Sequence, residues 1–452
     1  MRHQNLRLRI LALSVVVAAA ATIFAIQEVV WPPGSPARSP FEHAVLVLTF
    51  AWLTPALPAT FGLIGLLTYR RWHESPPGEP LTTLVCFRIV SRGQNAEALA
   101  STVTNIRLEM QRSRCFPYRI EAVTDLPVDV PTAPDFVHLV VPETYQTPNR
   151  SLYKARALQY ALEASDLPDD AWMMHLDEES HITGSVVKGI QAAVAEEEAS
   201  GEHRIGQGAI LYHRHVCAKP FLSLADMLRT GDDLGRFYFQ HRIGVTIFGL
   251  HGSFILVRNS VEKEVGFDFG PVGSITEDAF WALVQMGQGR RCRWVDGFIV
   301  EQAPERVRDF IKQRRRWFIG LIKCVRSTPV ALRWRIPLGL ATAIWAVSWV
   351  GILATYLNLI AGQEVGDVEQ AIGDLAFAVY ISYYILGLKL NLEDHPPVGK
   401  LRASAYYVAM TVLIPIYAIL EGLGVLYGLI RPESGFHVIQ KSADARAKPA
   451  AG

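Results

Sequence analysis

Three consecutive acidic residues, Asp177, Glu178 and Glu179, follow an apolar run that begins at Ala171. Such a run predicts a buried strand, and the acids would then stand at its end. Because strand side chains alternate, Asp177 and Glu179 would point to one side and Glu178 to the other. Two carboxylates on one side repel each other unless a cation lies between them, and oxygen ligands suit Mg2+ or Mn2+. The pattern predicts a metal site, with a solvated strand-to-loop turn as the alternative.

A second acidic pair, Glu277 and Asp278, stands where a helix is expected to begin. Ser274 or Thr276 can cap a helix that runs to about Met286, which places both acids in its first turn. The helix dipole alone favours acids in that position. The pair is therefore either a catalytic acid site or a set of residues that stabilise the helix.

The stretch Pro304 to Val325 reads as an amphipathic helix with one apolar and one basic face, typical of a helix that lies along a membrane surface. Within it, Gln313, Arg316 and Trp317 are three and four residues apart, so they are expected to face a common neighbour. Arg314 falls inside the apolar stripe. A buried guanidinium requires an anionic partner, which would be a carboxylate, a lipid headgroup or a substrate phosphate.

The elements that must position these residues alternate between strand and helix. The expected strands are Thr82 to Val90, Tyr118 to Thr124, Phe136 to Val141 and the run before Asp177, and the expected helices are Asn95 to Arg112 and Ser151 to Ala164. This order predicts a parallel sheet whose ligands gather at the carboxyl ends of the strands, where Asp125 and Asp177 lie. No G-x-G-x-x-G follows the first strand and no P-loop lysine is present, which argues against a dinucleotide fold and a P-loop NTPase.

A further strand is expected within Thr246 to Arg258, with His251-Gly252-Ser253 inside it. A glycine inside a strand often lets a ligand or another backbone approach closely, and the alternative is a simple bulge. Gly252 is therefore a candidate for the wall of a binding site.

Half of the 452 residues are hydrophobic, and the apolar excess collects in blocks near both ends of the chain. These blocks are Ile10 to Val30, Ala44 to Tyr69, Ile336 to Ala361, Ala371 to Leu388 and Ala403 to Ile430. About 20 apolar residues cross a bilayer, so each block is a transmembrane candidate. Between them lie about 260 residues of ordinary soluble composition, enough for a substantial core.

Basic residues near the apolar blocks predict the orientation in the membrane. Lys and Arg flank the soluble stretch on both sides, whereas the short loop Gly362 to Gln370 is acidic. The N-terminus and the soluble domain are therefore expected in the cytoplasm. The last block, about 42 Å of helix, is overlong for one span and short for two, and a bent or re-entrant segment there would reconcile it with the basic tail. A net charge of +1 argues against nucleic-acid binding, and five scattered cysteines suit a reducing compartment.

These features, in this order, resemble the membrane-bound family 2 glycosyltransferases. More narrowly, the segments that look like those of the egghead-type β-1,4-mannosyltransferases are Val85-Cys-Phe-Arg-Ile-Val-Ser-Arg-Gly93, His175-Leu-Asp-Glu-Glu-Ser180, Ile275-Thr-Glu-Asp278 and Arg314-Arg-Arg-Trp317. The resemblance covers roughly residues 80 to 325 and the apolar blocks on either side. It implies an α/β catalytic domain of the GT-A (Rossmann-like) type in the cytoplasm, flanked by transmembrane helices.

The resemblance also implies roles for individual residues. Arg88 and Asp125 lie where the family holds the nucleotide base and ribose, and Lys154 matches a lysine that neighbours the nucleotide. Asp177 and Glu179 match the metal-binding D-x-D, with Glu in the second position as a departure from the pattern. The residues expected at the catalytic and acceptor side are Asp278 as general base, Glu277 beside it, Gly252, Gln313, Arg316 and Trp317.

The implied reaction transfers a hexose, mannose from GDP-mannose first and a UDP-hexose second, to a membrane lipid acceptor. One base and one metal site predict a single displacement with inversion, which yields a β-glycosidic bond. A processive β-polysaccharide synthase and a non-catalytic membrane scaffold are the alternatives. The expected domains are a transmembrane hairpin (1–71), the catalytic domain (72–303), an interfacial helix (304–335), transmembrane helices (336–430) and a polar tail (431–452).

Overall fold

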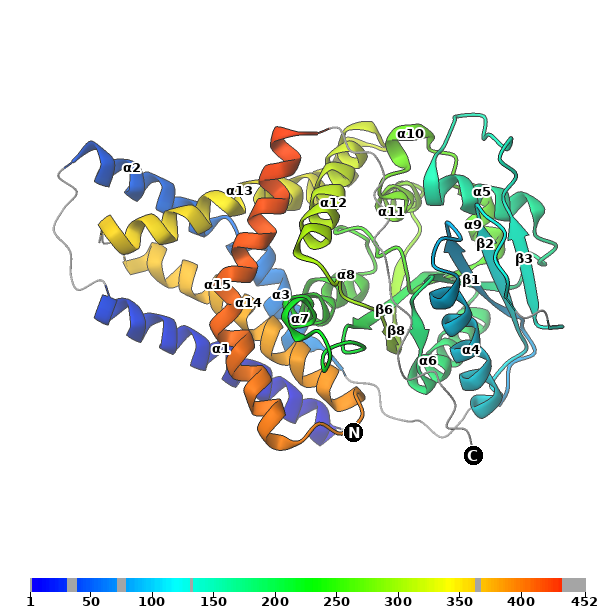
Figure 1. Ribbon diagram of the computed structural model, residues 1–452, viewed down its shortest axis with the longest axis horizontal. Coiled ribbons are helices and arrows are strands. Elements are labelled where there is room, and N and C mark those ends of the chain that lie inside the picture. Colours follow the sequence, from blue (N-terminus) through cyan, green and yellow to red (C-terminus); the bar gives the residue numbers. More distant parts are fainter. Residues whose placement is uncertain (1, 31–38, 71–78, 131–132, 362–366, 433–452) are drawn as a thin grey trace.

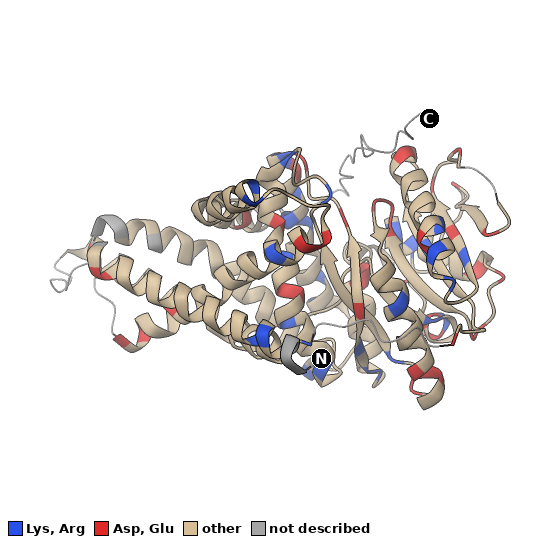
Figure 2. Ribbon diagram, turned by 90° about the horizontal axis from the view of Figure 1, so that it is seen from below, with Lys and Arg blue, Asp and Glu red and all other residues tan. Residues whose placement is uncertain are grey.

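The computed structural model describes residues 2–30, 39–70, 79–130, 133–361 and 367–432. They form a domain built on one sheet and a bundle of long helices beside it (Figure 1). Charged residues gather in the sheet domain and are sparse along the bundle (Figure 2). The predicted tail, 431–452, lies outside the described residues except for its first two. The predicted α/β domain with apolar helices around it is confirmed.

Eight strands form one mixed sheet in the order β3-β2-β1-β4-β7-β6-β8-β5. They are β1 (Val85–Ser91), β2 (Tyr118–Thr124), β3 (Phe136–Val140), β4 (Trp172–Asp177), β5 (His181–Ile182), β6 (Ile205–Leu211), β7 (Ile255–Arg258) and β8 (Cys292–Val300). The first four strands run parallel, as predicted. β7 runs antiparallel to its neighbours β4 and β6, so the expectation of an all-parallel sheet is wrong beyond β4.

Helices cover both faces of the sheet because successive side chains of a strand point to opposite sides. Phe87 of β1 packs under α4 (Ala96–Ser113) and α6 (Gly184–Ser200). Cys86 packs on the other face, under α5 (Tyr153–Ala164), α9 (Asn259–Val265) and α11 (Glu277–Gly287). β1 is buried along its whole length and forms a rigid centre for the loops at its carboxyl end.

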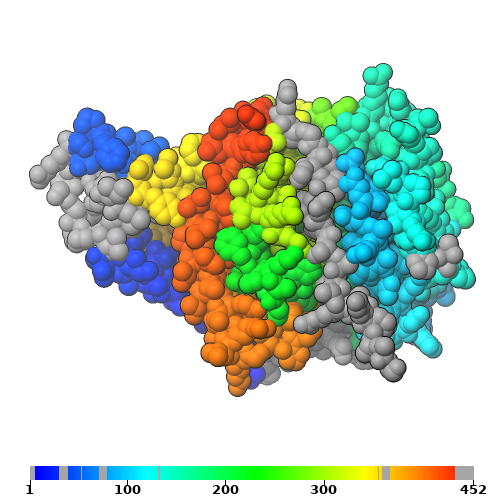
Figure 3. All heavy atoms as spheres, viewed as in Figure 1, coloured from blue at the N-terminus to red at the C-terminus, as the bar shows by residue number. Residues whose placement is uncertain are grey.

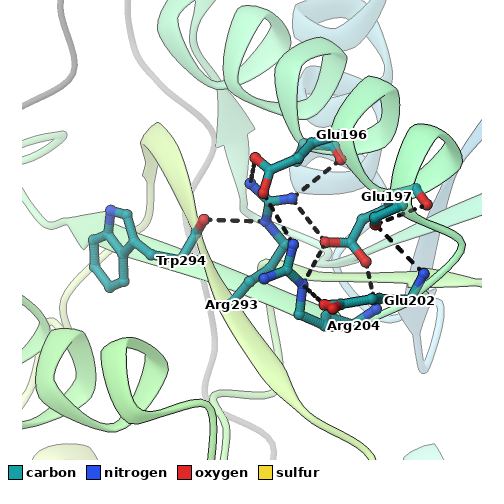
Figure 4. A network of polar contacts seen from close by, with 8 residues as sticks. Glu196, Glu197, Glu202, Arg204, Arg293 and Trp294 are labelled. Atoms are coloured by element: carbon teal, nitrogen blue, oxygen red, sulfur yellow. Dashed lines mark hydrogen bonds and ion pairs between the residues drawn. The ribbon is translucent and has the colours of Figure 1, made fainter.

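The end of the sheet opposite those loops is held by ion pairs (Figure 4). Glu197, fully buried near the end of α6, accepts from Arg204 at 2.8 Å and from Arg293 at 2.7 Å. The two arginines stand at the starts of the parallel strands β6 and β8. The network therefore sets the register of these strands at their amino ends, while their carboxyl ends carry residues toward the candidate site.

The segment His251 to Ser253 lies in a loop before β7, which begins at Ile255, so its predicted position inside a strand is wrong. Phe254, fully buried, ends the loop with a φ of 60°, a left-handed conformation that is rare for a residue with a Cβ. This turn reverses the chain before β7 pairs with β4. Gly252 consequently reaches the site from a loop and not from a strand.

Four helices among the described residues are long and apolar enough to cross a membrane. They are α1 (Arg2–Val30), α13 (Leu332–Ala361), α14 (Asp367–Asp394) and α15 (Lys400–Ile430). The predicted second span, Ala44 to Tyr69, is divided into α2 (Pro40–Thr49), a 3-10 turn η1 (Phe50–Leu53) and α3 (Ala56–Thr68). Pro55 and Pro58 explain the break, since proline lacks the N–H that would continue a helix. The expectation of a single spanning helix in this block is therefore wrong.

The last apolar block, whose form the sequence left open, is one continuous helix, α15, with Pro415 inside it. In the space-filling view α15 runs along the boundary between the bundle and the sheet domain (Figure 3). Gly424 lets α12 (Val307–Ser327) approach, because a Cβ there would lie 2.5 Å from the Cβ of Arg314. α15 is thus packed directly against the helix that carries the Gln-x-x-Arg-Trp motif.

The centre of the apolar face of α12 is covered by protein, whereas Val307 at the start of the helix is exposed. Phe310 and Phe318 are fully buried, and the Phe318 ring meets that of Trp345 on α13 edge-on. Arg314 donates to Asp226 of α7 (Pro220–Asp232) at 2.5 Å and to Glu421 of α15 at 2.7 Å. The anionic partner predicted for Arg314 is therefore a pair of carboxylates, and it fixes α12 to both neighbours.

Candidate active site

Lys154, on the first turn of α5, connects three parts of the site. Its Nζ donates to Asp177 Oδ1 at the end of β4 at 2.5 Å and to the carbonyl oxygen of Gly252 at 2.7 Å. Glu277 Oε1 lies 3.8 Å away. Burial by itself would lower the pKa of Lys154, but the carboxylates of Asp177 and Glu277 outweigh it and raise that pKa. Lys154 therefore stays charged and draws the predicted acids together.

The pair at the start of α11 differs in exposure. Glu277 is buried, whereas Asp278 is half-buried and its Oδ1 accepts the N–H of Ala279 at 2.8 Å. Burial and the neighbouring charge of Asp278 raise the pKa of Glu277 to about 7, against the opposing effect of Lys154. Burial also raises the pKa of Asp278. Both carboxyls thus have raised pKa values, a property suited to acid–base chemistry.

Gly252 lets its loop approach Asp278 and Lys154 closely. A Cβ at this position would lie 3.2 Å from Asp278 Oδ2 and 3.3 Å from Lys154 Nζ. The pocket at this point is lined by Lys154, Leu158, His175, Gly252, Ile255, Phe267, Glu277, Asp278 and Trp281. Tyr153, next to Lys154, has a φ of 53°, so a strained residue adjoins the site at α5 as Phe254 does before β7.

Glu301, directly after β8, is an acid of the site that the sequence argument missed. Its Oε1 accepts from Ser180 at 3.2 Å and from Ser253. Burial and the charges of Asp177 and Glu179 raise the pKa of Glu301. Three carboxylates therefore lie within electrostatic range of one another. The apolar run before Glu301 in β8 was the signal that could have placed an acid at another strand end.

The predicted metal ligands fit a divalent ion only together with a substrate. No group of three His, Cys, Asp or Glu in the described part of the chain has the arrangement of a complete metal site. Mg2+ and Mn2+ commonly take one or two carboxylates and complete their shell with water and phosphate oxygens. Glu178 turns away as expected, toward Ser91 and Asn95. Asp177, with Glu179 and Glu301 close by, would supply the protein ligands of such a partial site.

The two residues predicted to hold the nucleotide differ in accessibility. Asp125, just beyond β2, is about a quarter exposed and accepts from Arg156 at 2.7 Å. Arg88 is fully buried, with its guanidinium paired to Glu121 at 2.8 Å and to Glu262 at 3.3 Å. Because its position in β1 points it into the layer under α9, Arg88 does not reach the site surface. The prediction of a direct nucleotide contact is corrected for Arg88.

The motif on α12 forms a second group. Gln313 accepts from Arg314 at 2.6 Å, and the guanidinium of Arg314 lies 4.6 Å from the ring centre of Trp317. Arg314 is therefore a common neighbour of Gln313 and Trp317, and Arg316 is half-buried on the same helix. A Cβ at Gly320 would lie 2.4 Å from Thr276, so α12 packs tightly on the residue before Glu277.

A histidine–aspartate pair next to Gly252, formed by His251 and Asp233, was also not predicted. His251 Nε2 lies 2.6 Å from Oδ1 of the buried Asp233, and its ring stands 4.2 Å from that of Phe237. Asp233 and Phe237 delimit a π-helical turn, η2 (Asp233–Phe237), a feature common at functional sites. His251 lowers the pKa of Asp278, opposing the effect of burial. The pair was missed because Asp233 and His251 meet only in the folded chain.

Comparison with known proteins identifies the family. The profile of the Glycosyl transferase family group 2 matches residues 172–392. The β-1,4-mannosyltransferase egh of Drosophila melanogaster is 30% identical over 404 residues, covering 87% of this chain and 87% of that protein. The chain belongs to the family 2 glycosyltransferases. Its predicted resemblance to the egghead-type enzymes is thereby confirmed.

This glycosyltransferase is also 29% identical over 388 residues to the β-1,4-mannosyltransferase bre-3 of Caenorhabditis elegans, covering 84% of this chain and 83% of that protein. Among solved structures it resembles the mannosyltransferase PcManGT from Pyrobaculum calidifontis in complex with GDP-Man and Mn2+. That similarity has a TM-score of 0.47 and 14% identity, over 86% of this chain and 99% of the other.

Proposed function

We propose that this glycosyltransferase transfers mannose from GDP-mannose to a membrane glycolipid, with inversion at the anomeric carbon and formation of a β-glycosidic bond. The observation that carries the proposal is the alignment, over most of the chain, with relatives named β-1,4-mannosyltransferases. A UDP-hexose is the second candidate donor. The proposed catalytic domain is 72–303, on the cytoplasmic side, since basic residues flank it at both ends.

Asp278 is the proposed general base. It is more exposed than Glu277, and its Oδ2 lies beside Gly252. The acceptor hydroxyl oxygen forms a bond to the anomeric carbon, the bond from that carbon to the phosphate oxygen breaks, and the hydroxyl proton passes to Asp278. His251 lowers the pKa of Asp278, and the charge of Asp278 raises the pKa of Glu277. A single displacement of this kind inverts the configuration.

The departing diphosphate carries the charge that the site must absorb. Asp177, with Glu179 and Glu301 nearby, is proposed to hold Mg2+ or Mn2+, which would neutralise the phosphates when bound. Lys154 supplies a fixed positive charge beside Asp177. We place the ribose near Asp125, and the diphosphate and acceptor along the face of α12 that bears Gln313, Arg316 and Trp317.

A donor panel tests this function directly. Membranes from cells that express the protein are supplied with radiolabelled GDP-mannose, UDP-glucose, UDP-galactose or UDP-N-acetylglucosamine, in Mg2+ or Mn2+, beside membranes that carry Asp278→Asn. GDP-mannose is expected to be the preferred donor, with label transferred by the wild type alone. Preference for a UDP-sugar would assign another hexose. Absence of transfer from every donor would contradict the proposal.

A further inference from the structure

Arg229 on α7 lies between two aromatic rings. Its guanidinium carbon is 4.6 Å from the ring centre of Tyr212 and 4.6 Å from that of Trp317. Within the part of the chain that the structure describes, Arg229 donates no hydrogen bond and forms no ion pair. The side chain is half-buried, and its five N–H donors have no protein acceptor.

Two nearby carboxylates, those of Asp226 and Glu301, accept no hydrogen bond from Arg229. Asp226, three residues earlier on α7, gives its Oδ1 to Arg314. Glu301 accepts from two serines, and both carboxylates act on Arg229 electrostatically without direct contact. The charge of Arg229 is therefore stabilised while its hydrogen-bonding capacity stays open.

The position of Arg229 is fixed relative to the proposed transfer site. Tyr212 directly follows β6, and the N–H of Glu301 donates to the carbonyl oxygen of Leu211 at 2.8 Å. Trp317 belongs to the motif on α12. Arg229 thus stands between the acids at the strand ends and the α12 motif, where the site has an excess of carboxylates and a substrate phosphate would need a cation.

We propose that Arg229 binds a phosphate oxyanion of a substrate at the transfer site, with Tyr212 and Trp317 holding its guanidinium plane in place. A planar guanidinium matches two phosphate oxygens at once, and its confinement between rings reduces the entropy lost on binding. The proposal rests on the proposed function, since a nucleotide sugar brings two phosphates into the site. The phosphate belongs either to the donor or to the headgroup of the acceptor lipid.

The test compares the purified full-length wild type with Arg229→Gln and Arg229→Lys. Arg242→Gln serves as matched control, because Arg242 is an exposed arginine on the neighbouring α8 (Tyr238–Ile243). Three measurements are made: the inhibition constants of GDP and guanosine, the KM for acceptor lipids with and without a phosphate, and the thermal shift caused by inorganic pyrophosphate. Arg229→Lys keeps the charge and so remains informative where loss of the cation disturbs folding.

If the phosphate belongs to the donor, Arg229→Gln should raise the inhibition constant of GDP on the order of 10- to 100-fold, as expected for a charged hydrogen bond, and leave that of guanosine unchanged. An acceptor phosphate predicts a rise of that size in the KM for the phosphate-bearing lipid alone. Arg229→Lys should fall between. Behaviour equal to that of Arg242→Gln in all three measurements would overturn the proposal. The pyrophosphate shift needs no sugar donor, so it distinguishes failure of this proposal from failure of the proposed mannosyl transfer.

Discussion

Replacement of Asp278 by Asn removes the proposed base with almost no change in volume. Asn keeps an oxygen that can accept the Ala279 N–H, so the start of α11 should stay intact. Lys154 and Asp177, the proposed donor-side contacts, keep their 2.5 Å hydrogen bond. The substitution therefore isolates the loss of a proton acceptor from loss of structure or of donor binding.

A positioned general base contributes about 100- to 10,000-fold, or about 2.7 to 5.4 kcal/mol of barrier. We expect the Asp278→Asn variant to fall near the middle of this range, about 1,000-fold. Glu277 limits the loss, because its raised pKa of about 7 makes it a reserve base. Its burial and its position 3.8 Å from Lys154 keep that reserve poor.

The assay is the initial rate of mannosyl transfer, with the donor KM measured alongside. Asp278→Asn should lower kcat and leave the donor KM within about 3-fold, as expected for a group that acts in the transition state. Glu277→Gln is the matched control, and a loss below about 10-fold is expected because Glu277 is more deeply buried than Asp278. Near-normal turnover of Asp278→Asn would mean that Asp278 only stabilises the helix. A larger loss from Glu277→Gln would exchange the two roles.

The pH–rate profile should show activity lost as pH falls, at a pH above the usual titration range of an aspartate, because burial raises the pKa of Asp278 and the base must be ionised. Glu277→Gln removes a like charge and should move this limb to lower pH, and an unmoved limb would contradict the coupling. A chelator and Asp177→Ala should each abolish transfer, with added Mn2+ rescuing only the chelated wild type; full activity in chelator would refute metal dependence. A cysteine at the exposed Ser200 should resist an impermeant thiol reagent in intact cells, and labelling there would reverse the proposed orientation. Arg314→Met should destabilise the protein by about 3–5 kcal/mol in unfolding experiments, because it leaves the carboxylates of Asp226 and Glu421 without their cation. An unchanged unfolding midpoint would contradict the role of Arg314 in fixing α12 to its neighbours.

Local patterns predicted the parts of the fold that depend on local physics. The strand Tyr118 to Thr124 was predicted with its correct bounds, and Glu277 and Asp278 were correctly placed in the first turn of a helix, because apolar runs and turn residues act over a few positions. The same reasoning placed Asp177 at a strand end and turned Glu178 to the opposite side. Neighbouring residues suffice to determine these features.

Burial and long-range pairing decided what local patterns could not. Arg88 lies in the predicted strand, but the buried acids that bind it come from β2 and α9. Its own segment therefore could not predict that its side chain is buried. Asp233 meets His251 across 18 positions of chain, through a π-helical turn that no simple periodicity signals. Arg229 was missed for the same reason, since its two rings come from the residue that follows β6 and from α12.

The central claim is that one mannose is transferred with inversion to a membrane lipid, and the product itself tests it. Membranes containing the protein are incubated with radiolabelled GDP-mannose and Mn2+ and extracted with organic solvent. The account predicts a discrete labelled lipid, heavier by one hexose, whose label is released by a β-mannosidase and not by an α-mannosidase. Water-soluble label of high molecular weight would contradict it in favour of a processive synthase, and release by the α-mannosidase would refute inversion.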